Sequence, residues 1–101
     1  MGLDDIYIIV HEEDVARQAK ARIGRAKDVF AEIQRIKSEE QFREVTGEPD
    51  VIPGDLPPPS QCRIHVCGSS VAVCLGVQRT VLMSAGYTTF LHWKGSVPYP
   101  T

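Results

Sequence analysis

The stretch at residues 12–36, EEDVARQAKARIGRAKDVFAEIQRI, carries the strongest structural signal in this sequence. At 100° per residue its apolar side chains fall on one broad stripe, which is the pattern of an amphipathic helix. The acidic residues at its start suit the positively polarised beginning of a helix. We therefore predict a long helix that ends or bends near Lys37. The stripe consists of Val15, Ala19, Ile23, Ala26, Val29, Phe30, Ile33 and Ile36.

Two shorter elements are expected on either side of this helix. Residues 6–10 form an apolar, mostly β-branched run, which predicts a buried strand. After the helix, Ser38 followed by Gln41 matches a capping box, and Gly47 suits the end of a short second helix. A single continuous helix that reaches Val45 is the alternative.

The second half of the chain differs from the first in its residue composition and pattern. Residues 51–60 are rich in proline, which predicts a stiff, extended linker. Beyond it, β-branched and aromatic runs separated by small residues predict strands joined by tight turns. The predicted strands are residues 62–67, 70–77, 80–85 and 87–93.

These elements define the expected fold class and domain organisation. We expect one α+β domain over residues 1–101, in which an N-terminal strand, the long helix and the short helix pack on a four-stranded antiparallel meander. Residues 1–50 form the strand and helical half, 51–60 the linker, 61–95 the meander and 96–101 a proline-rich tail. Such a tail joins a sheet only at an edge.

Composition restricts the class of protein. The chain has 101 residues, 43% hydrophobic, with a formal net charge of -2, from which we expect one folded domain rather than a two-domain enzyme. The longest uninterrupted apolar run, at residues 6–10, is far below the roughly 18 residues that cross a bilayer, so we expect no membrane association. An acidic opening and an odd number of cysteines, three, predict a cytoplasmic protein with reduced thiols.

Self-association is the favoured function. In the predicted meander the long helix covers one sheet face, while the opposite face is more apolar than a solvated face should be. The helix stripe also has coiled-coil spacing, although a plain core helix is the alternative. We expect a non-enzymatic protein-interaction or regulatory protein that forms a homo-oligomer, with a dimer favoured, and binds a protein partner. The predicted interface consists of Ile23, Ala26, Phe30, Ile33, Val81, Met83 and Phe90.

Anion binding is the alternative function. Five basic residues occupy the middle of the helical stretch without an acid among them, and such a flank can hold nucleic acid or a nucleotide. A solvated helix flank is the plainer interpretation, because the chain as a whole is mildly acidic. The candidate residues are Arg17, Lys20, Arg22, Arg25 and Lys27.

Metal binding and catalysis have weaker support. The weak metal candidates Cys62, His65, Cys67 and Cys74 have a spacing that matches no standard zinc motif. We therefore predict no metal and no cofactor. No phosphate loop or nucleophile elbow occurs, and an enzyme would have to use His65 or His92 with a cysteine.

Overall fold

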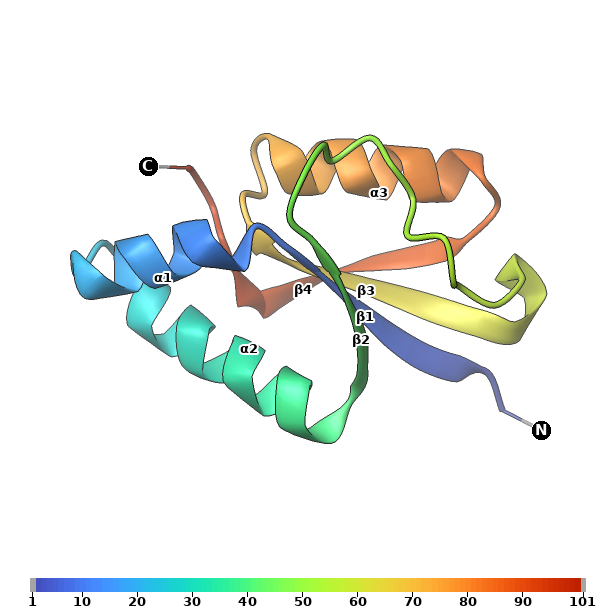
Figure 1. Ribbon diagram of the computed structural model, residues 1–101, viewed down its shortest axis with the longest axis horizontal. Helices are drawn as coiled ribbons and strands as arrows, with labels where there is room; N and C mark the ends of the chain where they lie inside the picture. Colours follow the sequence, from blue (N-terminus) through green and yellow to red (C-terminus); the bar gives the residue numbers. More distant parts are fainter. Residues whose placement is uncertain (1, 101) are drawn as a thin grey trace.

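Strands and helices alternate along the chain in the computed structural model, which describes residues 2–100 (Figure 1). In chain order the elements are β1 (Asp4–Val10), α1 (Glu12–Lys20), α2 (Ala26–Glu39), β2 (Gln41–Val45), the 3-10 helix η1 (Pro59–Gln61), β3 (Cys62–Ser69), α3 (Cys74–Ser84) and β4 (Thr88–Val97).

The four strands form one parallel sheet in the order β2-β1-β3-β4. In this register Tyr7 lies between Phe42 and His65 on the neighbouring strands, and His65 pairs with Phe90. The predicted antiparallel meander is therefore wrong. Each pair of successive parallel strands needs a long crossover connection, so the sequence between them cannot be the tight turns that we expected.

Helices cover both faces of the sheet (Figure 1). α1 and α2 pack on one face, where Ile9 and Cys67 of the sheet meet Val29, Ile33 and Ile36 of α2. α3 packs on the other face through Leu75 and Leu82. The apolar sheet face that we expected a partner to cover is thus covered largely by α2 of the same chain.

The largest error in the prediction concerns residues 70–85. The two strands expected there are a loop and α3, whose buried side chains Leu75, Gln78 and Leu82 follow helical spacing. The expected turn at Ala85 and Gly86 is the end of this helix. Gly86 has a φ of 93°, and the N–H groups of Gly86 and Tyr87 donate to the carbonyls of Met83 and Leu82. This pair of bonds is the Schellman motif that closes helices.

Three other elements differ from expectation. The long helix is broken into α1 and α2, because residues 21–25 form a turn. The predicted short helix after Ser38 is strand β2. The tail does not leave the sheet at residue 96: β4 continues to Val97, and Ser96 and Val97 are buried and pair with Gly68 and Ser69 of β3.

The proline-rich segment lies against the fold. Ile52 and Leu56 pack on the core between the sheet and α3. The Tyr87 hydroxyl donates to the carbonyl oxygen of Pro57 at 2.7 Å. The segment is therefore the crossover from β2 to β3. Between residues 2 and 100, no helix combines the length and the apolarity that crossing a bilayer requires.

Candidate anion-binding groove

The turn between α1 and α2 organises the candidate site. Arg22 and Gly24 both adopt left-handed backbone conformations, with φ of 59° and 50°. The N–H of Ile23 donates to the carbonyl of Gln18 at 3.0 Å and fixes the turn. Because α1 follows β1 almost directly, this turn projects from the carboxyl edge of the sheet, the edge where open α/β sheets bind ligands.

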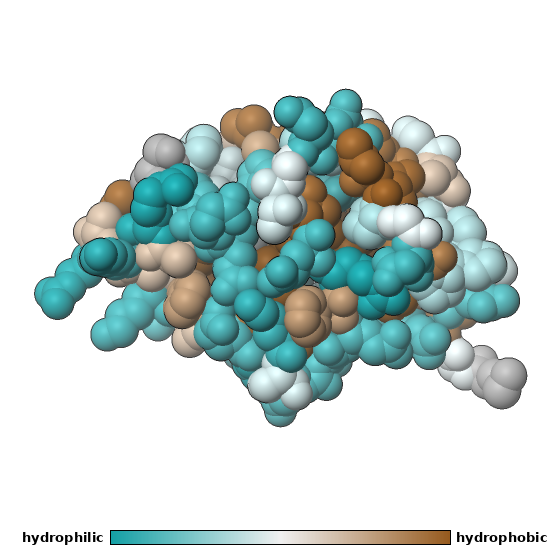
Figure 2. Space-filling model, viewed as in Figure 1, coloured by the Kyte–Doolittle hydropathy of each residue, from teal (hydrophilic) through white to brown (hydrophobic). Residues whose placement is uncertain are grey.

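A basic groove lies between α1, α2 and this turn. Its volume is about 660 Å³, and cations from all three segments reach it. Figure 2 shows long polar side chains projecting at the end of the molecule where α1 and α2 meet. The basic groove is lined by Ala16, Ala19, Lys20, Arg22, Gly24, Lys27 and Phe30.

The three cations of the basic groove are unengaged. Lys20, Arg22 and Lys27 are exposed, and among the described residues none of them forms an ion pair or a side-chain hydrogen bond. The other lysines and arginines that the structure describes are engaged, with the exception of Arg79 on α3; for example, Arg35 contacts Glu32, Glu39 and Glu40. Unpaired cations that converge on one groove are typical of an anion-binding surface.

The other two predicted anion-binding residues have internal roles. Arg17 is paired with the buried carboxylate of Asp14. Arg25 donates to the carbonyl oxygens of Trp93 and Ser96, at 2.6 and 2.7 Å. The fold therefore brings three of the five predicted residues together and uses the remaining two to hold α1 and β4 in place.

An acidic groove of about 350 Å³ adjoins the basic groove. It shares Ala16 and Phe30 with the basic groove and is otherwise lined by Glu12, Glu13, Glu44 and Thr46. Lys37 lies 3.0 Å from Glu12 and 3.3 Å from Glu44, which neutralises much of this charge. Although burial opposes it, hydrogen bonds from Gln34 and Lys37 lower the pKa of Glu12.

An aromatic pocket of about 410 Å³ lies on the other side of the same turn. Trp93 and Tyr99 line it together with Ile23, Arg25 and Pro98, and Gly24 lines both this pocket and the basic groove. The Arg25 guanidinium lies 4.2 Å from the centre of the Trp93 ring. Strand alternation alone predicts that Trp93 faces the core, but it is 52% exposed. The available sequence signal was Tyr99 between Pro98 and Pro100, with Trp93 a few residues before it.

The crevice between the carboxyl ends of β1 and β3 is filled by the chain itself. Gly68 has a φ of 109°, and a Cβ at this position would lie 2.0 Å from the Val10 carbonyl oxygen. The Ser69 hydroxyl donates to the buried carboxylate of Asp14, which also accepts from Gln18 at 2.9 Å. These contacts fill the crevice between β1 and β3, where the chain connections diverge to opposite sides of the sheet, and they hold α1 in place.

The two histidines that we considered for catalysis each contact a carboxylate. His65 Nε2 lies 2.8 Å from Asp5, and His92 Nε2 lies 2.6 Å from Glu32. The Tyr7 ring lies between them, stacked on His65 at 4.7 Å and edge-on to His92 at 5.3 Å. Hydrogen bonds from His65 and Arg63 lower the pKa of Asp5.

The metal candidates are separated by the sheet. Cys62 packs in the core on the α3 side, whereas Cys67 packs in the core on the α2 side. His65 contacts Asp5, and Cys74 begins α3. Within residues 2–100, no three His, Cys, Asp or Glu side chains are arranged to hold a metal ion. Burial raises the pKa of all three thiols, and that of Cys67 to about 12.

The residues of the predicted self-association interface are dispersed. Ala26 and Ile33 are buried on the inner side of α2, which contains them, while Phe30 and Val81 are half-buried. The exposed members lie on three different elements of the fold: Ile23 on the α1–α2 turn, Met83 on α3 and Phe90 on β4.

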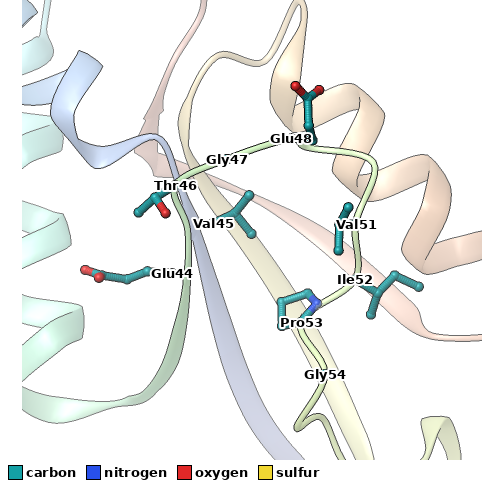
Figure 3. Close-up of a pocket in the computed structure, with 9 residues that line it drawn as sticks. All are labelled: Glu44, Val45, Thr46, Gly47, Glu48, Val51, Ile52, Pro53 and Gly54. Atoms are coloured by element: carbon teal, nitrogen blue, oxygen red, sulfur yellow. The ribbon is translucent and has the colours of Figure 1, made fainter.

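A further cavity, of about 390 Å³, lies in the loop that follows β2. In Figure 3, Val45 and Val51 point into the loop, whereas Glu44 and Glu48 point away from it. This cavity therefore lacks the convergent polar side chains of a ligand site.

Comparison with known proteins adds no assignment to this geometry. No family model matches the chain, and neither the curated proteins nor the solved structures yield a match.

Proposed function

We propose that this protein binds an anionic ligand, nucleic acid or a nucleotide, in the basic groove. The observation that carries the proposal is the convergence of Lys20, Arg22 and Lys27 on one groove, with no ion pair among the described residues to neutralise them. Phosphate groups supply the charge that such a groove lacks. Phe30 adds an aromatic surface to the same groove, on which a base can stack.

The net charge of -2 is compatible with this function. Much of the acidic charge is already paired, as in the contacts of Glu12 and Glu44 with Lys37. At ordinary salt the field of a charge is screened beyond about 10 Å, so a ligand close to the groove responds to the unpaired cations of the groove and not to the net charge of the chain.

We further propose a non-enzymatic role in the cytoplasm. The free cysteines, two of which are buried in separate cores, support a reducing compartment.

Fluorescence anisotropy tests the proposal with a labelled single strand about a dozen nucleotides long. Neutralisation of the groove by Lys20→Gln, Arg22→Gln and Lys27→Gln together should weaken binding at least about tenfold at low salt. The slope of log K against log salt should fall by roughly 0.7 for each phosphate that the variant no longer binds. Arg79→Gln is the control for the single variant Arg22→Gln, because it removes the same charge, and Arg79 is exposed on α3 and also lacks an ion pair among the described residues.

The outcomes are distinct. A weaker affinity and a smaller salt slope in the triple variant and in Arg22→Gln, but not in Arg79→Gln, support the groove. Equal losses of affinity in the single variants Arg22→Gln and Arg79→Gln would indicate a diffuse charge effect and overturn the proposal. Absence of binding by the unmodified protein at low salt would also overturn it.

A second function, self-association, is favoured by a separate observation. The basic and acidic grooves are neighbours that share Ala16 and Phe30. Two copies related by a twofold axis near Phe30 would place the acidic groove of each on the basic groove of the other. An interface of this kind is self-complementary, as twofold dimers require.

Glu13→Lys separates the two functions, because Glu13 is exposed and lines the acidic groove. The added cation should weaken a dimer of this geometry in sedimentation experiments, since it then faces Lys20 of the other copy. The same substitution should strengthen binding of the single strand. Glu48→Lys, in the loop after β2, makes the same change in net charge outside both grooves and serves as the control. A monomer at all concentrations, before and after substitution, would contradict self-association.

A further inference from the structure

We infer that the ligand of the basic groove is single-stranded nucleic acid and that the aromatic pocket accepts one of its unstacked bases. This inference rests on the proposed function, because the phosphates of the same strand would lie along the basic groove. The inference adds a second subsite, which would distinguish a strand that carries bases from a strand that offers only phosphate charge.

The aromatic pocket has the features of a stacking site. Trp93 is 52% exposed and Tyr99 is 70% exposed, so both rings are accessible. The pocket volume of about 410 Å³ lies within the range of roughly 300–1,000 Å³ that is usual for small-molecule sites. Every base has an aromatic face, and stacking on exposed aromatic side chains is the common means of binding single strands.

Both walls of the pocket are held by hydrogen bonds. Arg25 bonds to the carbonyl oxygens of Trp93 and Ser96 while its guanidinium lies over the indole ring. The Gln18 amide donates to the Tyr99 carbonyl oxygen at 2.9 Å and secures the segment that carries this ring. Little ordering is then needed when a base enters, which favours binding.

The pocket and the groove are continuous through the α1–α2 turn. Arg22 lines the basic groove, the next residue Ile23 lines the aromatic pocket, and Gly24 lines both. A strand that crosses this turn can leave phosphates beside Lys20, Arg22 and Lys27 and insert a base next to Trp93. This juxtaposition of charge and aromatic surface is the combination that single-strand binding proteins use.

A single strand fits this arrangement better than a duplex. In a duplex the bases are stacked and paired, and only their edges are accessible in the grooves. Insertion of a base into the aromatic pocket requires it to be unstacked, which costs little in a single strand.

Trp93 provides a direct readout, because it is the only tryptophan in the chain. The protein is titrated with a single strand of thymidylate about a dozen nucleotides long, with an abasic strand of equal length and charge, and with the corresponding duplex. We expect the thymidylate strand to quench Trp93 fluorescence and to bind at least about fivefold more tightly than the abasic strand. The abasic strand and the duplex should bind with little quenching.

Substitutions locate the effect. Tyr99→Ala should remove most of the advantage of thymidylate over the abasic strand while leaving the affinity for the abasic strand unchanged. Phe90→Ala is the matched control, since Phe90 is an exposed aromatic residue of β4 that does not line the pocket. It should preserve the advantage.

The possible failures are separable. If no strand binds, the proposed function fails, and this inference fails with it. If the thymidylate and abasic strands bind equally and neither quenches Trp93, the groove function stands and the aromatic subsite is overturned. Tighter binding and stronger quenching by the duplex would overturn the choice of a single strand.

Discussion

The Nε2 atom of His92 on the edge strand β4 lies 2.6 Å from the carboxylate of Glu32 on α2. Arg35 donates two further hydrogen bonds to this carboxylate, at 2.8 and 2.9 Å. The Glu32 side chain is only 3% exposed. Hydrogen bonds from Arg35, together with that from His92, outweigh the cost of burial and lower the pKa of Glu32 to about 2. Glu32 therefore links α2 to the edge of the sheet as a buried anion.

The pH dependence of stability follows from this shift. Because the pKa of Glu32 is lower in the folded state than its ordinary value of 4.5, its contribution is fully present above that value and is lost as the pH falls towards 2. The shift corresponds to about 3 kcal/mol. Glu32→Gln should lower the free energy of unfolding in urea by about 2–3 kcal/mol at neutral pH, and the difference should shrink between pH 5 and pH 2.

Glu39→Gln is the control for this prediction. Glu39 contacts the same Arg35, at 3.4 Å, but its side chain is 59% exposed. Exposed pairs contribute little, so this substitution should change the free energy of unfolding by less than about 0.5 kcal/mol. A difference between wild type and Glu32→Gln that stays constant from pH 7 to pH 2 would contradict the role of the buried anion.

Gly68 is expected to be the least replaceable glycine of the fold. Its φ of 109° is unfavourable for other residues, and an added Cβ would lie 2.0 Å from the backbone oxygen of Val10. Gly68→Ala should destabilise the protein by more than about 4 kcal/mol or yield insoluble material. At Gly47 an added Cβ meets nothing within 4 Å, so Gly47→Ala should remain folded. Thermal unfolding of both variants checks the prediction, and a stable Gly68→Ala protein would refute it.

The sequence allows some elements to be predicted but not their connection. The strand predicted at residues 6–10 lies within β1, and the strand predicted at residues 62–67 covers most of β3, because short β-branched runs between turn signals are local features. Helix α3 is not predictable in this way, because its valines and threonine favour strands and one of its three buried positions is the polar Gln78. When the residues of α3 are interpreted as strands, only short turns remain between the strands, and short turns predict an antiparallel sheet.

The candidate site is predictable only in part, for a related reason. Lys20, Arg22 and Lys27 are close in sequence, so their cluster is visible without a structure. Arg25 looks equivalent, but its partners Trp93 and Ser96 lie 68 and 71 residues away. The aromatic pocket likewise joins the α1–α2 turn to the end of β4, and such pairings depend on the order of the strands.

The three cysteines should differ in their reactivity. Cys62 and Cys67 are buried, and burial raises the pKa of Cys67 to about 12, whereas Cys74 is half-buried at the start of α3. Because the thiolate is the reactive form, N-ethylmaleimide should label Cys74 first in the native protein. Mass spectrometry of digested protein measures the order, with urea-unfolded protein as the control in which all three react. Labelling of native Cys67 as fast as Cys74 would contradict the buried position of Cys67.

Arg25 should control both the stability of the α1–α2 turn and the position of Trp93. Lysine at this position keeps the charge but cannot reach two carbonyl oxygens with one planar group and stack on the indole ring at the same time. Arg25→Lys should therefore lower the free energy of unfolding by about 1 kcal/mol. It should also shift Trp93 emission to longer wavelength, because the ring becomes more exposed to water. Arg79→Lys, at an exposed arginine without an ion pair among the described residues, should change neither quantity. If the emission and stability of Arg25→Lys match those of wild type, the contacts of Arg25 with β4 do not hold the turn in solution.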